Sequence, residues 1–354
     1  MGAPDHNDIS PSDTVVDLIG VCKTYRQKQR SAKLSEVFRT MLRPQIRQVE
    51  ALREITMQVG RGEVLAYAGP NGAGKSTTIK LLSGLLAPDA GTVRVLGLDP
   101  IRHRTQYVRR IGVVFGQRTE LWWDQPIAAS FEWKRVVWDV PRPRYERMLG
   151  LLKELLGLDE LFHSLARELS LGQKMRADLG MALLHEPEIL FLDEPTLGLD
   201  VLAKRDILRF ITDLNREQRI TVVVTSHDMS DLEQLAGRIV LIHKGRIAFD
   251  GSWERLRREF TDQRRLLLEI AGGPPPILTA ATLVSNEAGR CEYVFDAGHK
   301  SIAALLAEAA AQVEILDVET HRAAIDDVIA DIYERWQQDG TRSHEGGLAK
   351  TSAP

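Results

Sequence analysis

The sequence predicts an α/β protein, because strand-like apolar segments alternate with helical segments along much of its 354 residues. The apolar runs at residues 189–192 and 220–225 are continuous, which is typical of parallel strands that are buried on both faces of a sheet. Between these two runs, residues 201–218 repeat apolar side chains at helical spacing. A strand, a helix and a strand in this order indicate a parallel sheet covered by helices.

The start of the chain is expected to hold two strands with a basic insertion between them. Residues 15–19 and 51–59 have the apolar composition of strands. Residues 26–49 carry seven Arg and Lys side chains against one acidic residue, Glu36, and apolar residues recur at helical spacing over 34–42. Two interpretations stay open: a short amphipathic helix packed on the domain's own surface, or a helix at the membrane face or against a membrane partner.

The same alternation continues through the middle of the chain. We expect strands at 92–96 and 110–115, helices over most of 126–186, and a hairpin at 238–249 that turns at Lys244 and Gly245.

A second, small α+β domain is expected near the C-terminus, where residues 271–276, Ala-Gly-Gly-Pro-Pro-Pro, continue neither a helix nor a central strand. Its expected strands are 266–270, 291–295 and 313–318, and its expected helices are 302–311 and 323–336, the latter with a solvated acidic face formed by Asp326, Asp327 and Asp331. The predicted organisation is a flexible tail at 1–13, a main domain at 14–258 with a helical subdomain at about 118–186, an accessory domain at 259–337 and a disordered tail at 338–354.

A glycine-rich stretch follows an apolar strand predicted at 63–68 and opens a helix predicted at 77–86. Its residues are Gly69, Pro70, Asn71, Gly72, Ala73, Gly74, Lys75, Ser76 and Thr77. Glycines free backbone N–H groups to surround a triphosphate, a lysine neutralises phosphate charge, and the following hydroxyl reaches Mg²⁺. The sequence therefore predicts that the main domain binds a nucleoside triphosphate with Mg²⁺.

Two adjacent carboxylates, Asp193 and Glu194, come directly after four apolar residues and before Pro195. Phosphoryl transfer depends on charge neutralisation and an oriented water more than on covalent chemistry. We expect Asp193 to complete the metal shell, through water, and Glu194 to activate the attacking water. The alternative is that the pair only caps the following helix.

The composition limits the other classes of function. A net charge of −3 argues against a nucleic-acid binder. The two cysteines, Cys22 and Cys291, are far apart and are expected to be reduced thiols. No stretch approaches the roughly 18 to 20 apolar residues that cross a bilayer. Any membrane role is therefore expected to come through another chain, with this protein peripheral at the cytoplasmic side of the cell membrane.

Several further motifs stand in a fixed order around the glycine-rich stretch, and over about residues 15–253 the chain resembles the ATP-binding subunits of ABC transporters. Residues 169–173, Leu-Ser-Leu-Gly-Gln, are similar to that family's signature, with Leu171 in place of a glycine. Residues 195–200 resemble the D-loop, which ends at Asp200. Gln117 stands at the position of the Q-loop glutamine, and His227 at that of the switch histidine.

The resemblance implies an ATPase and assigns roles within its site. It implies that Lys75, Gln117, Glu194 and His227 are catalytic, and that Ser76, Gln117 and Asp193 hold Mg²⁺. Tyr25 takes the place of the aromatic that stacks on adenine, although an aromatic at a strand end is often only packing. Ser170, Gly172, Gln173 and Asp200 are expected to complete the ATP site of a second subunit, with Leu171 pointing away.

The partners implied are a second copy or a homologous ATP-binding subunit, arranged head to tail around two ATP molecules, and an integral membrane permease. The chain is similar to exporters of the ABC-2 type, and residues 116–123 and 169–173 resemble the viologen and multidrug exporter branch. The competing interpretation is a soluble ABC ATPase that acts on ribosomes or DNA. Its ribosomal members usually carry two P-loops, whereas this sequence holds one.

Four tryptophans, Trp122, Trp123, Trp133 and Trp138, follow Gln117 closely. They are either a core aromatic cluster or a groove that grips a helix of the membrane subunit, since amphipathic aromatics are favoured anchors at interfaces.

Overall fold

The computed structural model describes residues 13–28, 46–116, 118–260, 263–287, 289–296 and 299–322, together with 325, 328, 329, 332, 333 and 336. Two compact units divide the chain, Met1–Gly251 and Ser252–Pro354, and each is described by itself. Among the described residues, no helix has the length and apolar composition to cross a membrane.

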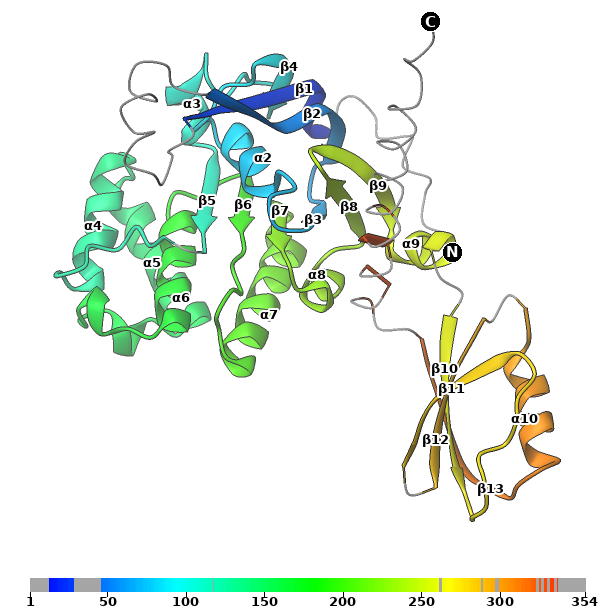
Figure 1. Ribbon diagram of the computed structural model, residues 1–354. Helices are drawn as coiled ribbons and strands as arrows, with labels where there is room; N and C mark the ends of the chain where they lie inside the picture. The colour runs from blue at the N-terminus through cyan, green and yellow to red at the C-terminus, as the bar shows by residue number, and fades with distance from the viewer. Residues whose placement is uncertain are drawn as a thin grey trace, which may run out of the picture. The chain divides into compact units, whose positions relative to one another are not determined.

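The first unit is built on a six-stranded sheet with the order β5-β6-β7-β3-β8-β9 (Figure 1). The strands from β5 to β8 run parallel to one another. Their bounds are β3 Val64–Ala68, β5 Ile111–Phe115, β6 Ile189–Asp193, β7 Thr221–Ser226, β8 Arg238–His243 and β9 Arg246–Ser252. The first four residues of β6 are fully buried, because helices cover both faces of a parallel sheet. The predicted parallel α/β sheet is thereby confirmed.

The β8–β9 hairpin turns where the sequence predicts it. Lys244 and Gly245 both have positive φ values, 47° and 78°. A Cβ added at Gly245 would lie 2.8 Å from the carbonyl oxygen of Ala51. A glycine is therefore required at this turn, both for its backbone angle and for the close approach of β2.

A second, antiparallel sheet has the order β2-β1-β4. Its strands are β1 Thr14–Lys28, β2 Ile46–Gly60 and β4 Ala90–Val95. Both ends of the basic insertion are thus strand, which corrects the shorter strands expected there. The helix predicted at 34–42 lies outside the described residues. Apolar side chains of the two sheets, among them Leu18, Ile55, Tyr67 and Phe191, form one continuous core with Ile79 of the helix at residues 75–82.

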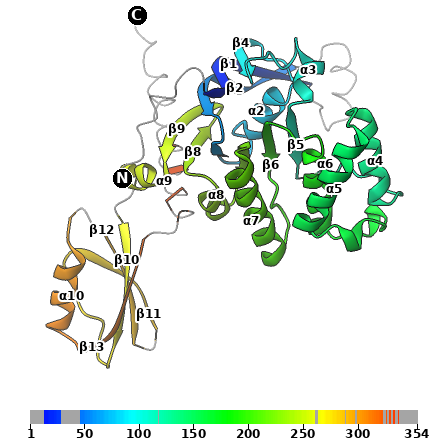
Figure 2. The same ribbon diagram turned by 180° about the vertical axis from the view of Figure 1, so that it is seen from behind.

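The helices of the first unit are α2 Lys75–Leu82, α3 Arg104–Val108, α4 Ile127–Val137, α5 Arg142–Leu156, α6 Leu171–Leu183, α7 Val201–Gln218 and α8 Met229–Leu235. In both ribbon views, α4, α5 and α6 gather beside the β5 edge of the sheet (Figures 1 and 2). The prediction that α2 runs to residue 86 is wrong, because Gly84 has a φ of 71° and ends the helix in a left-handed conformation.

The second unit contains α9 Trp253–Phe260 and a four-stranded antiparallel sheet of order β11-β12-β10-β13. The sheet strands are β10 Gln263–Ile270, β11 Ala281–Glu287, β12 Arg290–Asp296 and β13 Ile315–Arg322. The helix α10, Ile302–Ala310, packs Leu305 and Ala309 on this sheet, in a core with Leu266 and Tyr293. The strand β11 was missed because most of its residues are exposed and its sequence shows no apolar alternation.

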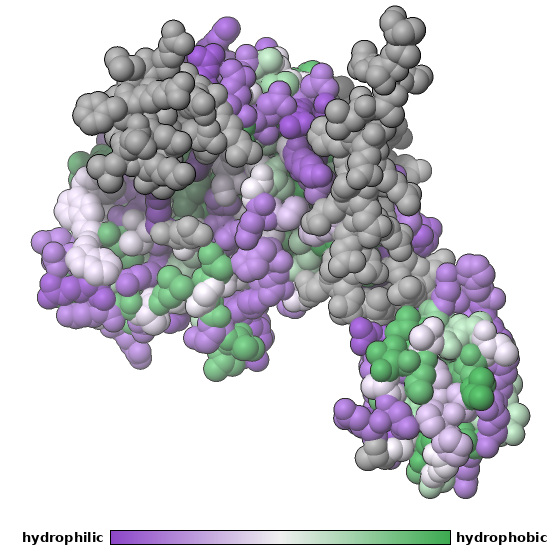
Figure 3. All heavy atoms as spheres, viewed as in Figure 1, coloured by the Kyte–Doolittle hydropathy of each residue, from purple (hydrophilic) through white to green (hydrophobic). Residues whose placement is uncertain are grey.

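Exposed apolar side chains are visible on the second unit as green spheres in Figure 3. The exposed apolar side chains of its sheet include Leu283 and Val284 of β11 and Leu316 and Val318 of β13, the two edge strands. Within the helix predicted at 323–336, the described residues are helical, and Ile325, Val328, Ile329 and Ile332 are buried. The acidic face predicted there, at residues 326, 327 and 331, lies outside the described residues.

Candidate functional site

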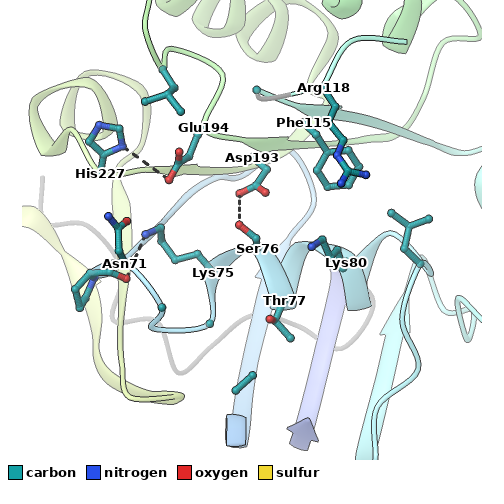
Figure 4. A pocket seen from close by; sticks show the side chains of 17 residues that line it. Asn71, Lys75, Ser76, Thr77, Lys80, Phe115, Arg118, Asp193, Glu194 and His227 are labelled. Carbon is teal, nitrogen blue, oxygen red and sulfur yellow. Dashed lines mark hydrogen bonds and ion pairs between the residues drawn. The ribbon is translucent and has the colours of Figure 1, made fainter. Parts of the chain in front are cut away.

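A cavity of about 790 Å³ opens where β5, β6 and β7 end (Figure 4). Ligands of open parallel sheets gather at this end of the strands. The cavity is lined by residues from the glycine-rich stretch, by both carboxylates and by the histidine, namely Pro70, Asn71, Gly72, Gly74, Lys75, Ser76, Thr77, Asp193, Glu194 and His227. The structure thus brings together segments that lie far apart in the sequence.

The glycine-rich loop has a conformation that only glycines adopt readily. Gly72 and Gly74 have φ values of 79° and 120°. A Cβ at Gly74 would lie 2.7 Å from the Ala51 carbonyl oxygen, and one at Gly69 would lie 2.4 Å from that of Ile242. Gly69 and Ala73 also belong to the loop but do not line the cavity. They lie on the buried side of the loop, where a Cβ at Gly69 would contact Ile242 and Ala73. The loop therefore delivers the N-terminus of α2 to the cavity, where free N–H groups and the helix dipole favour an anion.

Lys75 is the cation nearest the loop, and only 6% of it is exposed. Its Nζ donates to the carbonyl oxygens of Gly69, at 2.6 Å, and of Pro70, at 3.4 Å. Burial lowers the pKa of Lys75, and the charges of Glu194 and Asp193 oppose that shift. Two carbonyl oxygens thus hold the Lys75 ammonium group at the cavity, and the charges of the two carboxylates favour its protonated form.

The carboxylate of Asp193 accepts hydrogen bonds from two hydroxyl groups, one on α2 and one on β7. Its Oδ1 accepts from Ser76 Oγ at 3.2 Å and from Thr225 Oγ1 at 2.7 Å. A hydroxyl and a carboxylate this close together are oxygen ligands that suit Mg²⁺. Gln117, the third expected metal ligand, lies outside the described residues.

Glu194 is fixed by its backbone. Its N–H donates to the carbonyl oxygen of Thr225 at 3.0 Å and to Thr225 Oγ1 at 3.1 Å, and its φ of 56° is unusual for a residue other than glycine. The Glu194 carboxylate Oε1 lies 3.8 Å from Nδ1 of His227, which follows β7 directly. Both side chains therefore face the same cavity, as the dashed line in Figure 4 shows.

Tyr25 lies beside the cavity rather than in its wall. Its hydroxyl is 3.4 Å from Oγ1 of Thr77, which does line the cavity. Tyr25 is half-buried and pairs with Val49 across β1 and β2.

The signature-like residues and Asp200 lie at the starts of α6 and α7 and do not line this cavity. Ser170 and Gln173 form a reciprocal capping box at the start of α6, and Asp200 caps α7 by accepting from the N–H groups of Leu202 and Ala203. A Cβ at Gly172 would lie 2.9 Å from that of Ala203, so Gly172 allows α6 to approach α7 closely. Leu171 is 45% exposed.

Sequence reasoning missed several residues of the cavity. Lys80, Phe115 and Arg118 lie on the opposite side of the Ser76–Asp193 pair from Lys75 (Figure 4). Lys80 stands one helical turn after Ser76, a spacing from which it could have been found. The support that Thr225 gives to Asp193 and Glu194 was also missed, although a threonine near the end of a buried strand beside the cavity indicates a hydrogen-bonding role there.

The tryptophan segment forms a separate groove of about 330 Å³, lined by Glu120, Trp122, Trp133, Lys134, Val137 and Trp138. We call it the tryptophan groove. Trp122 and Trp133 are 42% and 40% exposed, with ring centroids 5.6 Å apart, and Trp123 is 58% exposed. This exposure excludes the core interpretation for these three. Trp138 is half-buried and stacks on His185 at 5.0 Å.

Comparisons with known proteins point to one family. A family model described as "ABC transporter" matches residues 52–197. The ABC transporter ATP-binding protein NatA of Bacillus subtilis is 30% identical over 208 residues, which cover 59% of this chain and 84% of that protein. The bacitracin transport ATP-binding protein BcrA of Bacillus licheniformis is 30% identical over 212 residues, which cover 59% of this chain and 67% of that protein.

A solved structure described as the ATP-binding subunit of an ABC transporter superposes with a TM-score of 0.57 at 25% sequence identity, covering 70% of this chain and 93% of that one. Its similarity confirms the P-loop NTPase fold. The glycine-rich loop, the carboxylate pair and the relatives agree that the chain binds and hydrolyses ATP. The chain belongs to the ABC transporter ATP-binding proteins.

Proposed function

We propose that this chain is the ATP-hydrolysing subunit of an export system, and that it drives a separate integral membrane subunit from the cytoplasmic face of the cell membrane. The observation that supports the proposal most directly is that only a few residues of the chain separate the cavity at the glycine-rich loop from the tryptophan groove. Gly116 and Arg118 line the cavity at the glycine-rich loop, which we call the ATP cavity, and Glu120 and Trp122 line the tryptophan groove. A membrane-subunit helix seated in the groove therefore lies only a few residues from bound ATP.

Export, rather than import, is what the resemblance to ABC-2 exporters implies, and one relative is named for bacitracin transport. The large exposed aromatic surfaces of the groove fit an amphipathic helix of a protein partner, since aromatic anchors in hollows supply much of the binding energy at interfaces.

Within the ATP site, backbone N–H groups of residues 71–77 and the Lys75 ammonium group hold the triphosphate, and Tyr25 stacks on the adenine. Glu194 accepts a proton from the attacking water. His227, whose Nδ1 lies 3.8 Å from Oε1 of Glu194, orients the terminal phosphate. Ser76 and Asp193, joined by a 3.2 Å hydrogen bond, and Gln117 hold Mg²⁺. When bound, Mg²⁺ neutralises charge on the terminal phosphates.

Ser170, Gly172, Gln173 and Asp200 serve a second copy of the chain or a homologous subunit. Supporting this, Ser170 and Asp200 stand at the N-termini of α6 and α7 and do not line their own cavity. A helix N-terminus attracts anions, so Ser170 and Gly172 at the start of α6 suit the γ-phosphate of a nucleotide held by the other chain. ATP then joins the two chains, and loss of the bridging phosphate on hydrolysis releases them.

Co-purification with the neighbouring membrane protein tests the proposal. The tagged chain is co-expressed with the membrane protein encoded beside it, and recovery of that protein from detergent extracts is measured. The Trp122→Ala, Trp123→Ala double variant is expected to lower recovery about tenfold or more, as loss of an aromatic anchor does. The double variant Leu283→Ala, Val284→Ala removes exposed apolar side chains from β11 and serves as the control.

Equal recovery with both double variants would count against the groove as the docking site. Co-sedimentation with ribosomes, or retention on DNA, would then support the competing class of ABC ATPase.

A further inference from the structure

A short segment joins the ATP cavity to the tryptophan groove. Its described residues are 116 and 118–122, and side chains of α4 and α6 hold residues 119, 120 and 122. At its start, the Gly116 N–H donates to the Asp193 carbonyl oxygen at 2.7 Å. Further along, the N–H groups of Glu120 and Trp122 donate to side chains, Asp178 Oδ1 at 3.0 Å and Ser130 Oγ at 2.9 Å. Asp178 of α6 and Ser130 of α4 therefore place the backbone of Glu120 and Trp122, whereas β6 holds Gly116.

A single oxygen atom of Asp178 accepts two hydrogen bonds from this segment. Its Oδ1 accepts from Glu120 N–H and from Thr119 Oγ1, both at 3.0 Å. The Thr119 hydroxyl in turn accepts from the N–H of Leu121 at 3.0 Å. Through one side chain of α6, three consecutive residues of the segment are held.

Burial of the Asp178 carboxyl group costs free energy, and packing of the core alone does not explain why it is there. Asp178 is only 7% exposed, and burial raises the pKa of its carboxyl group to about 7 despite the two hydrogen bonds that favour its charged form. Lys134, also buried, pairs with Glu120 and supplies the nearest positive charge. A carboxyl group kept at such a position is better explained by its two acceptor contacts than by filling of the core.

We propose that Asp178 is a positioning residue for ATP hydrolysis, which fixes the segment from Thr119 to Leu121 so that Gly116 and Arg118 keep their places beside Asp193 and Glu194. The connection is short. Arg118 lines the ATP cavity next to Thr119, and a Cβ at Gly116 would lie 2.1 Å from the Glu194 carbonyl oxygen, so a small shift of the segment displaces the backbone that carries the two carboxylates.

Steady-state ATP turnover by the purified chain tests this. Asp178→Ala removes the acceptor and is expected to lower kcat about tenfold, with KM for ATP changed less than about twofold. Asp178→Asn keeps an oxygen acceptor of the same size and is expected to stay within about twofold of the wild-type kcat. Thr119→Val is expected to lower kcat about threefold, and to cause a smaller further loss when added to Asp178→Ala, because the bond between Thr119 and Asp178 is then already absent and only the contact with the Leu121 N–H remains to be lost.

Thr212→Val is the matched control, since its hydroxyl donates to the Leu208 carbonyl oxygen within α7 at 2.9 Å, away from the segment. It is expected to leave kcat unchanged and to be additive with Asp178→Ala. A wild-type kcat in Asp178→Ala, an equal loss in Asp178→Asn, or multiplied losses in the Asp178→Ala, Thr119→Val pair would overturn the role.

Thermal melts by circular dichroism accompany each assay. If Asp178→Ala is unfolded at the assay temperature, Thr119→Val alone decides: a reduced kcat in a fully folded protein supports the role, and an unchanged kcat overturns it. Because turnover is measured on the chain alone, neither outcome depends on the proposed membrane partner.

Discussion

Thr225 Oγ1 donates to Asp193 Oδ1 at 2.7 Å, the same carboxylate oxygen that accepts from Ser76. Thr225 also accepts from the N–H of Glu194 through Oγ1, at 3.1 Å, and through its backbone carbonyl, at 3.0 Å. One side chain of β7 thus holds the carboxylate expected at the metal and the backbone of the residue expected to activate water. Asp193 at the end of β6 and Glu194 directly after it are therefore both oriented from the neighbouring strand β7.

Thr225→Val is expected to lower kcat about tenfold while leaving ATP affinity within about threefold of the wild type. The valine keeps the volume of the side chain but leaves Asp193 without its second donor and Glu194 without one acceptor. Thr221→Val at the other end of β7 is the control, because Thr221 Oγ1 accepts from the Gly62 N–H at 2.9 Å, far from the cavity. The measurements are ATP turnover and equilibrium nucleotide binding. An unchanged kcat in Thr225→Val would show that Asp193 is oriented without it.

Lys75→Ala is expected to abolish turnover and weaken ATP binding about 10- to 100-fold, since it removes charge-assisted hydrogen bonds to phosphate. Lys80→Ala removes the same charge from the same helix and cavity, but Lys80 is exposed and lies on the other side of the Ser76–Asp193 pair. It is expected to weaken binding less than about threefold. Fluorescent-nucleotide titration compares the two variants, and equal losses would mean that net charge, not the loop position of Lys75, governs affinity.

Much of this site could be predicted from the sequence because its motifs are local. The glycine-rich loop needs glycines at fixed offsets, and Asp193 and Glu194 follow a run of buried residues. Each of these patterns is visible within a few residues, and the structure brings them into one cavity.

The supports of the site could not be predicted, because they depend on contacts between distant residues. Thr119 lies 59 positions before Asp178, and Asp193 lies 32 before Thr225. Asp178 occurs in a helix whose other buried residues are mostly apolar, and nothing in its neighbours distinguishes a buried carboxyl group from a solvated one. The exposed strand β11 was missed for a similar reason, since its pairing with β12 gives it a strand conformation that its own pattern does not specify.

Glu194→Gln is expected to bind ATP with near wild-type affinity and to lower kcat on the order of 100-fold or more, because the amide accepts no proton from water. If two chains close around ATP, the unreacted nucleotide then holds them together, and size-exclusion chromatography with light scattering should report a dimer only when MgATP is present. The double variant Lys75→Ala, Glu194→Gln is the control and is expected to remain monomeric. An ATP-loaded Glu194→Gln protein that elutes as a monomer would contradict the proposed two-chain arrangement.

Asp178→Asn is expected to change how stability depends on pH. Burial raises the pKa of Asp178 in the folded state to about 7, with the charge of Glu120 raising it further and that of Lys134 lowering it. An unfolded chain has an Asp pKa of about 3.9, so between these values the folded state binds one more proton than the unfolded state. The contribution of Asp178 is fully present below pH 3.9 and is lost as the pH rises through about 7.

The wild type is therefore expected to lose about 2 kcal/mol of unfolding free energy relative to Asp178→Asn between pH 5 and pH 8, and to change little above pH 8 from this group. Urea denaturation of both proteins at each pH measures the difference, and Asp206→Asn, which neutralises an exposed carboxylate on α7, controls for the change in net charge. A difference between wild type and Asp178→Asn that stays constant from pH 5 to pH 8 would mean that the buried carboxyl titrates near its ordinary pKa. Its two hydrogen bonds would then outweigh the loss of solvent around it.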